Sequence, residues 1–340
     1  MTPKTFHILV IRFSAMGDVA MTVNVLRALT EQYPQVKITV LTRGFFSPFF
    51  RDLKNVTVFT ADLKGKHKGV FGLYKLGRQL NKIHKFYAVA DIHNVLRTKV
   101  LKKVIRCRLF ASIDKGRAEK SALIKGKIFK QLKTTHQRYA DVFKTLGFPI
   151  DLSNPTFPEA KTISFNTLSG LQTKTEKWIG IAPFAAHKGK MYPLELMTEV
   201  IASLSKKHKV ILFGGGNEES KILEAIKDKY PSCINLAGKL NLDQELDVIS
   251  NLDVMLSMDS GNAHLAAMLG VKVITVWGVT HPYAGFAPFN QPEDYALIAN
   301  REQFPAIPTS VYGNKYPKGY EQASGSISPQ TIIDKIESVL

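Results

Sequence analysis

The sequence predicts an α/β protein of two doubly wound domains, each with a parallel sheet covered by helices. The chain has 340 residues, which is too long for one ordinary hydrophobic core and suits two domains. Short β-branched segments alternate with amphipathic helical segments in both halves, as in parallel sheets. Each half also has a buried strand that ends in a sharp polar turn and leads directly into a helix.

The first half alternates strands and helices with short connections. Runs of β-branched and other apolar residues mark the strands, and apolar residues at helical spacing mark the helices. The expected strands are 6–12, 37–41, 56–59 and 87–91, and the expected helices are 19–32 and 75–85. Two basic segments that contain glycine, 64–69 and 115–130, predict surface loop or helix.

The strand and helix pattern restarts after a change of character at residues 148–175, which are turn-rich and then polar. We place the domain boundary there and expect domains at 1–160 and 161–327. The same patterns predict strands at 178–183, 209–213, 254–258 and 271–277, and helices at 194–206, 218–229, 243–251 and 262–269.

The end of the chain predicts a loop and then a helix. Residues 303–327 are rich in Pro, Gly and Tyr, so we expect irregular structure. Ser328 can cap a helix, and Pro329 suits the first helical position. Residues 328–340 are therefore predicted as a terminal helix, which we expect to pack back toward the first domain.

Composition favours a cytoplasmic protein. No apolar run reaches the ~18 residues of a spanning helix, and the few residues before the first strand leave no room for a secretory leader. The two cysteines, Cys107 and Cys233, lie far apart, which argues against a disulfide framework or a zinc knuckle.

Positive charge is concentrated in the first half of the chain. Residues 1–150 hold 29 Lys and Arg against 8 Asp and Glu, whereas residues 151–340 hold 17 against 20. Such a half attracts phosphate-rich partners, which include an anionic membrane surface, a phosphorylated glycolipid and nucleic acid. The alternative is a solvated basic face without a specific partner.

Residues 257–264 (SMDSGNAH) are the strongest candidate for a binding site. They predict the end of a buried strand, a turn and the start of a helix, and Asp and Ser are good helix caps. Because a helix N-terminus has unpaired N–H groups and a partial positive charge, it suits a diphosphate. His264 lies about one turn into this helix, where a core or capping histidine is the alternative.

Three further turns follow predicted strands. Asp18, in the turn 14–18, could accept a proton from a hydroxyl nucleophile, or could merely favour the helix dipole. Lys190 could neutralise a leaving diphosphate, or could belong to a polar capping loop. The glycines at 214–216 allow a close backbone approach, but a tight turn explains them equally well. No metal-ligand spacing and no nucleophile elbow is found, so we expect no metal.

Residues 8–19 (ILVIRFSAMGDV) resemble the opening of the heptosyltransferases, glycosyltransferase family nine. Three later segments resemble that family in the same order: 182–193 with the sequence KMYP at 190–193, the turn at 214–219, and 259–264. The resemblance implies the GT-B fold, with two Rossmann-like domains that face a central cleft. It also implies an inverting transfer with no cofactor, in which the donor binds the second domain and the acceptor binds the first.

Site residues follow from the same resemblance. Asp18 resembles the general base of the family. The family's carboxylate on the nucleotide side aligns equally well with Glu218 and with Glu219. The implied donor residues are Lys190, Gly215, Glu218, Asp259, Ser260, Gly261 and His264, and the implied acceptor residues are Asn94, Arg97, His136 and Arg138.

The resemblance implies ADP-heptose as donor and an inner-core lipopolysaccharide (lipid A–Kdo type) as acceptor, with the protein cytoplasmic and peripheral to the inner membrane of a Gram-negative bacterium. A transferase of the same fold that uses another nucleotide sugar for a surface glycan is the alternative. A basic nucleic-acid-binding protein is a more distant one, because no nucleic-acid-binding motif accompanies the charge, and we expect no nucleic-acid partner. The sequence leaves the oligomeric state open.

Overall fold

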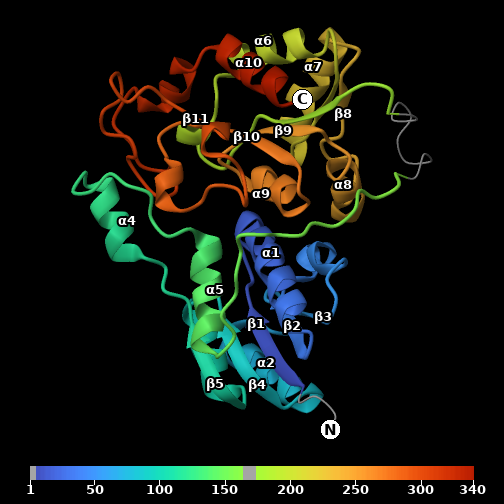
Figure 1. Cartoon of the computed structure of the whole chain (residues 1–340), viewed down its shortest axis with the longest axis vertical. Coiled ribbons are helices and arrows are strands. Elements are labelled where there is room, and N and C mark those ends of the chain that lie inside the picture. The colour runs from blue at the N-terminus through green and yellow to red at the C-terminus, as the bar shows by residue number, and fades with distance from the viewer. Residues whose placement is uncertain (1–4, 164–173) are drawn as a thin grey trace. The chain divides into compact units, whose positions relative to one another are not determined.

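The structure, a computed structural model, describes residues 5–163 and 174–340 (Figure 1). The chain forms two compact units, each built around one sheet. Unit 1 comprises the chain up to Lys115 together with Thr134–Thr156, and unit 2 comprises Gly116–Lys133 and Phe157–Leu340. Part of the polar stretch where we placed the boundary, residues 164–173, lies outside the described residues.

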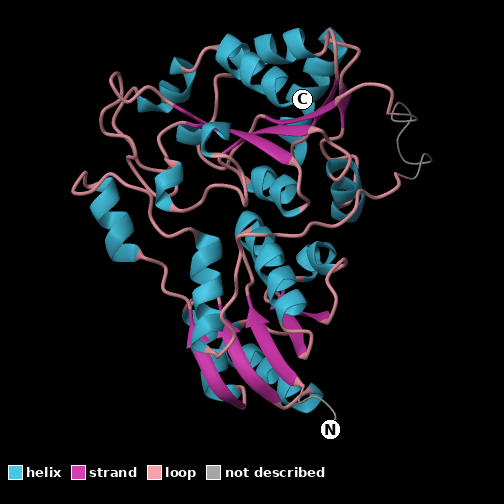
Figure 2. Cartoon of the chain, viewed as in Figure 1, coloured by secondary structure: helices cyan, strands magenta, loops and turns pink. Residues whose placement is uncertain are grey.

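Unit 1 contains, within its described residues, a five-stranded parallel sheet in the order β3-β2-β1-β4-β5. Its strands are labelled in Figure 1 and drawn in magenta in Figure 2. The strands are β1 (Phe6–Ile11), β2 (Val36–Thr42), β3 (Val56–Thr60), β4 (Phe86–Asp91) and β5 (Cys107–Ser112). The helices are α1 (Met16–Gln32), α2 (Gly69–Ile83), α3 (Leu96–Val104) and α5 (Thr135–Thr145), with a 3₁₀ segment, η1 (Gly44–Phe50).

The central strand β1 explains why this sheet is parallel and covered on both faces. Its residues Ile8 to Ile11 are all fully buried, so both sides of the strand face apolar helices. Helices α2 and α3 lie side by side and bury Leu73, Leu76 and Leu101 against the sheet. Helices α1 and α5 contact each other and cover the opposite face, as right-handed crossovers require.

Unit 2 contains, in the part of the chain that is described, a six-stranded parallel sheet in the order β11-β10-β9-β6-β7-β8. The strands are β6 (Trp178–Ala182), β7 (Lys209–Leu212), β8 (Ile234–Asn235), β9 (Val254–Met258), β10 (Lys272–Trp277) and β11 (Ala296–Ile298). The helices are α4 (Arg117–Ile124), α6 (Leu194–Leu204), α7 (Gly216–Lys229), α8 (Leu242–Ile249), α9 (Gly261–Met268) and α10 (Pro329–Val339). The short 3₁₀ segments are η3 (Lys188–Lys190), η4 (Pro282–Ala284), η5 (Glu293–Tyr295) and η6 (Tyr320–Ser326).

The terminal helix α10 belongs to unit 2. Ser328 caps it by accepting a hydrogen bond from the Thr331 N–H at 3.1 Å, as its sequence predicts. Ile332 and Ile336 are fully buried in the core of this unit, where α10 packs against α6 and strands β9 and β10. The helix packs on the second sheet because its apolar stripe completes that core. The expectation that it also packs back toward the first domain stays a prediction.

The basic segment 116–133 also joins unit 2, although it falls inside the predicted first domain. The Leu132 N–H donates to the Tyr283 carbonyl at 3.0 Å, and Leu123 and Leu132 form an apolar cluster with Ala284. The Lys120 ammonium lies 4.0 Å from the centre of the Phe286 ring. Composition shows the charge of this segment but not its partner, residues 283–286, which lie far along the chain.

Several elements differ from the prediction. Helix α2 begins at Gly69, six residues earlier than expected, because the glycine-containing segment before it suggested a longer loop. Elements α3, β5, α5, β8 and β11 lie where we predicted no strand or helix. Strand β5 is only half-buried and β8 has two residues, so neither leaves a strong apolar pattern. Among the described residues, no helix has the length and apolar character needed to cross a membrane.

One carboxylate makes the stability of unit 2 depend on pH. Burial raises the pKa of Glu245, in the first turn of α8, from the ordinary 4.5 to about 7. The folded protein therefore holds this proton more tightly than the unfolded chain. The contribution of Glu245 to stability is most favourable below pH 4.5 and declines as the pH rises to 7.

We expect Glu245→Gln to remove this decline and to stabilise unit 2 by about 1–3 kcal/mol at pH 8, with little effect at pH 4.5. The measurement is the melting temperature of both proteins across this pH range. Glu293→Gln, at an exposed carboxylate, is the control and should leave both values unchanged. An equal shift at the two pH values would contradict the assignment.

Candidate active site

Asp18, the predicted base, lies in the first turn of α1, directly after the central strand of unit 1. Its carboxylate forms an ion pair with the guanidinium of Arg12, which is buried at the end of β1 and also donates to the Ile92 carbonyl at 2.8 Å. A second contact comes from the Ala15 N–H, 3.3 Å from Oδ2 of Asp18. The side chain keeps 27% exposure, so Asp18 is held in one orientation while remaining accessible to a substrate.

Two buried side chains, which the sequence reasoning missed, complete the surroundings of Asp18. Nδ1 of His93 accepts a hydrogen bond from the Phe13 N–H at 3.4 Å. Burial and the positive charge of Arg12 lower the pKa of His93 to about 3, so this imidazole is neutral at physiological pH. The Tyr139 hydroxyl donates to the backbone carbonyl of Asp18 at 3.2 Å, and burial raises the pKa of this phenol. An arginine placed directly after an apolar strand was the one sequence signal for this cluster.

The predicted acceptor residues Asn94 and Arg97 follow β4 at the same edge of the sheet. Asn94 has a left-handed backbone (φ 46°) and donates from its side chain to the Ile113 carbonyl at 2.9 Å. Asp91 holds this turn, since its Oδ1 accepts from the Asn94 N–H at 2.7 Å. Asn94 therefore shapes the turn, whereas the exposed Arg97, in the first turn of α3, is available to an anionic ligand.

The other two predicted acceptor residues, His136 and Arg138, lie in α5 and are both buried. Nη1 of Arg138 lies 3.9 Å from Oδ2 of Asp114, which follows β5 and is 86% exposed. Because all five strands are parallel, the residues after β1, β4 and β5 share one edge of the sheet. Unit 1 thus gathers Asp18, Arg97 and the Arg138–Asp114 pair at its carboxyl edge.

In unit 2, the partly buried Lys190 and the buried Asp259 form an ion pair. Nζ of Lys190 lies 2.8 Å from Oδ2 of Asp259 and donates to the Asp259 backbone carbonyl at 3.2 Å. The Thr280 hydroxyl donates to the same Oδ2 at 2.8 Å. Since these three residues follow the adjacent strands β6, β9 and β10, the sheet itself brings them together. Their side chains lie beside the N-terminus of α9, which begins at Gly261.

Ser260 is the N-terminal cap of α9 and has an extended backbone. Its hydroxyl lies 3.1 Å from that of Ser257, so it pairs within the turn rather than with the helix. Gly261 opens the helix, and His264 is buried in its first turn. The predicted donor residues Lys190, Asp259, Ser260, Gly261 and His264 are therefore gathered around one helix N-terminus, the arrangement that suits a diphosphate.

The loop 303–327, to which the sequence assigned no role, holds the Lys190 segment in place. Gly313 has a left-handed backbone (φ 74°), and a Cβ atom there would lie 2.6 Å from Cγ of Lys190. The loop thus packs directly on the aliphatic part of the lysine. Ser324 donates to the Met191 carbonyl at 2.7 Å, and the Tyr316 ring packs against Gly189.

The turn before α7 distinguishes the two candidate carboxylates of the nucleotide side. Glu219 folds back on its own turn, where its Oε2 accepts from the Gly215 N–H at 2.7 Å. Glu218 is 85% exposed and lies 3.2 Å from the Lys221 ammonium. The side chain of Glu219 is therefore occupied by the backbone, which leaves Glu218 as the carboxylate that a ligand can reach.

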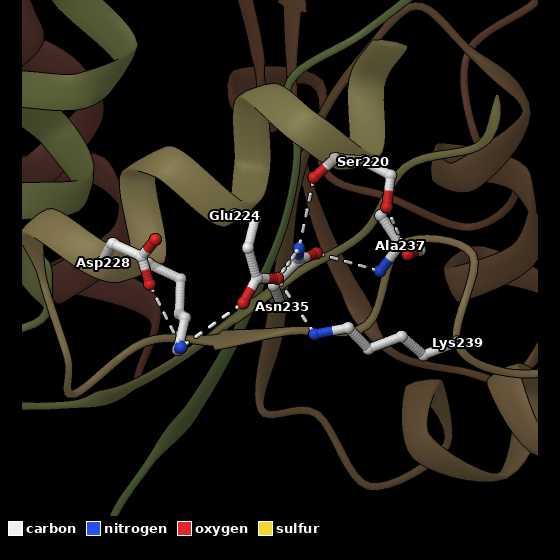
Figure 3. Close-up of polar contacts among 7 residues, drawn as sticks. Ser220, Glu224, Asp228, Asn235, Ala237 and Lys239 are labelled. Atoms are coloured by element: carbon white, nitrogen blue, oxygen red, sulfur yellow. Dashed lines mark hydrogen bonds and ion pairs between the residues drawn. The ribbon is translucent and has the colours of Figure 1, made fainter. Parts of the chain in front are cut away.

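Helix α7 is fixed to β8 by a polar cluster (Figure 3). Oε2 of Glu224 accepts from Asn235 at 2.7 Å and from Lys239 at 2.9 Å, and these bonds lower the pKa of Glu224 to about 2. Ser220, one turn earlier, donates to the Ala237 carbonyl at 2.8 Å. These contacts set the position of the helix whose N-terminus carries Gly215 and Glu218. No group of three or more His, Cys, Asp or Glu within the described ranges is placed to hold a metal.

Comparison with known proteins identifies the family. The family model of glycosyltransferase family 9 (heptosyltransferase) matches residues 73–312. The chain is 26% identical to the lipopolysaccharide core heptosyltransferase OpsX of Haemophilus influenzae, over 87% of this chain and 85% of that protein. It is 25% identical to lipooligosaccharide heptosyltransferase 2 of the same organism, over 98% and 99% of the two chains.

Solved structures agree on the fold. The structure of E. coli heptosyltransferase WaaC with ADP has a TM-score of 0.72 and 19% identity, covering 98% of this chain and all of that one. The predicted fold class, two Rossmann-like domains of the GT-B type, is confirmed. Since the family model spans more than half of the sequence, the chain belongs to glycosyltransferase family 9, the heptosyltransferases.

Proposed function

We propose that this glycosyltransferase moves a heptose from ADP-heptose to an inner-core lipopolysaccharide acceptor of the lipid A–Kdo type, with inversion and without a metal. Family membership and the names of the curated relatives support this donor and acceptor. The observation that carries the proposal is the Lys190–Asp259 pair beside the N-terminus of α9, because it is a ready site for a nucleoside diphosphate.

In this mechanism, Asp18 takes the proton of the acceptor hydroxyl as that oxygen attacks the anomeric carbon. The bond from the anomeric carbon to the phosphate oxygen breaks, and ADP leaves with the electron pair. Negative charge grows on the diphosphate, where Lys190 and the N–H groups of α9 stabilise it. An ammonium has three donors, and Asp259 uses two of them, so one remains for the diphosphate.

Exposure and charge support the other assignments in the proposal. Glu218 receives the ribose hydroxyls of the nucleotide, because Glu219 is occupied by the Gly215 N–H. Arg97, Arg138, His136 and Asn94 form the acceptor side, where cations complement the carboxylates and phosphates of the lipopolysaccharide core. We place the protein in the cytoplasm, peripheral to the inner membrane of a Gram-negative bacterium, with no nucleic-acid partner.

A panel of nucleotide sugars tests the proposal. The purified protein is incubated with a lipid A–Kdo acceptor and each donor, and both the released nucleotide and the mass of the product are measured. We expect turnover with ADP-heptose at least tenfold faster than with any other donor. Faster turnover with another nucleotide sugar would support the alternative transferase. Salt-dependent binding of DNA or RNA without transfer would overturn both.

A further inference from the structure

Helix α2 exposes large apolar side chains on the outside of unit 1. Phe71 is 86% exposed, Val70 66% and Tyr74 50%. The opposite side of the same helix is buried through Leu73, Leu76 and Leu80. The exposed side chains therefore take no part in the core. An exposed phenylalanine and valine in adjacent positions indicate a surface that another apolar phase covers.

Positive charge far exceeds negative charge in the sequence around these side chains. Between positions 63 and 108 the sequence has 13 Lys and Arg but a single acidic residue, Asp91, which is 2% exposed. In the described part of the chain, none of these 13 cations forms an ion pair. Such a field attracts a polyanionic surface. The exposed carboxylate of Asp62, just before this stretch, accepts from the Gly65 and Lys66 N–H groups and offsets only one of these charges.

A pocket of about 410 Å³ between the C-terminal ends of α2 and α3 concentrates this charge. Asn81 joins the two ends, since it donates to the Val104 carbonyl at 2.9 Å and accepts from the Arg106 N–H at 2.8 Å. The polar and aromatic residues that line the pocket are Tyr74, Arg78, Asn81, Lys82, Lys103 and Arg106. Four cations and no acid line it, so the pocket suits a phosphate group.

We propose that this face of unit 1, the α2–α3 face, docks the enzyme on an anionic lipid membrane. Val70, Phe71 and Tyr74 enter the interface between headgroups and acyl chains, and the pocket takes the phosphate of a lipid headgroup. Basic residues next to exposed aromatic and aliphatic ones on a helix are typical of interfacial membrane binding. The apolar residues favour lipid over a nucleic acid, whose phosphate surface gives Val70 and Phe71 nothing to bury against. The purpose of docking rests on the proposed function, which gives the enzyme a membrane-bound acceptor.

Vesicle sedimentation without any sugar nucleotide tests the docking itself. We expect the wild-type protein to bind phosphatidylglycerol-containing vesicles and not pure phosphatidylcholine. The double variant Val70→Ser/Phe71→Ser and the double variant Lys82→Gln/Arg106→Gln should each weaken this binding at least tenfold. The second pair should also lower the dependence of binding on salt concentration, because fewer ions are released.

Matched controls come from unit 2. Tyr312→Ser removes an aromatic side chain that is 64% exposed, and Lys206→Gln removes an exposed cation, so neither should change vesicle binding. Circular dichroism verifies that every variant is folded. The proposal would be overturned if the wild-type protein bound neutral and anionic vesicles equally. It would also be overturned if both double variants bound anionic vesicles as tightly as the wild-type protein does. Inorganic phosphate is then added as a competitor of vesicle binding. If it weakens the binding of the wild-type protein and of Lys82→Gln/Arg106→Gln to the same extent, the pocket is not the headgroup site.

An activity measurement separates this proposal from the proposed function. With ADP-heptose, the two double variants should keep wild-type turnover on a deacylated, water-soluble acceptor and lose at least tenfold on the same acceptor embedded in vesicles. If no protein transfers heptose but the vesicle results hold, the donor or acceptor assignment fails while docking stands. If transfer occurs and the double variants match the wild-type turnover on both acceptors, docking fails while the assigned activity stands.

Discussion

Asp18→Asn is expected to lower kcat for heptose transfer by about 10²–10⁴-fold, the usual contribution of a general base. The amide keeps the size of the side chain and can still accept the Ala15 N–H, so the turn before α1 should persist. It cannot take a proton from the acceptor hydroxyl. Binding of ADP should stay within a factor of two, because the residues proposed for the nucleotide belong to unit 2.

The loss of the Arg12 ion pair is the main complication of this experiment. Arg12 is buried and would face a neutral amide, which costs stability. The pH profile separates the two effects, since a general base produces an acidic limb in kcat/KM that the variant should lack. Asp151→Asn, at an exposed carboxylate of the same unit, is the control and should keep the wild-type profile. Activity within tenfold of wild type for Asp18→Asn would remove Asp18 from the role of base.

Lys190→Met is expected to lower kcat by about 10²–10³-fold and to raise KM for the donor, because a preorganised cation contributes this much at a developing charge. The substitution also leaves the Asp259 carboxylate buried with the Thr280 hydroxyl as its remaining side-chain donor. That carboxylate would then repel the departing diphosphate. The double variant Lys190→Met/Asp259→Asn should therefore recover part of the loss in kcat, which steady-state kinetics with each protein measures.

Gly313→Ala gives a milder form of the same test. The added Cβ would displace Lys190 without removing its charge, so KM for the donor should rise while most of kcat is kept. Melting temperatures of all three variants show whether the loop still packs. If Lys190→Met turns over at the wild-type rate, the lysine has no part in stabilising the leaving group.

Much of the fold could be predicted from the sequence because buried parallel strands and amphipathic helices leave strong local patterns. Strand β9 lies at its predicted residues, and β1, β4 and α6 lie within two residues of theirs. The two-residue strand β8 and the half-buried β5 were missed, since short or edge strands bury too little to impose a pattern.

The site was predicted in part, for a related reason. Asp18, Lys190, Asp259 and Ser260 each follow a strand within a short segment of sequence, so their strand–turn–helix context is visible locally. Arg12 lies in the same short segment as Asp18, and its place after an apolar strand was visible. His93 and Thr280 act through contacts between segments that follow separate strands, and no local pattern reveals which strands are neighbours. The choice between Glu218 and Glu219 required the backbone contact to Gly215, which only the folded turn contains. The catalytic and binding roles of these residues stay predictions.

The position of residues 116–133 has a consequence for dissecting the protein. Because this segment belongs to unit 2, the chain passes between the units at three places, 115/116, 133/134 and 156/157. No single cut yields two complete halves. A fragment that ends at residue 160 would carry Leu123 and Leu132 without Ala284, which packs against them. The remaining fragment would carry Ala284 without these two leucines. Any attempt to exchange one half for that of a relative must therefore transplant two discontinuous pieces of gene.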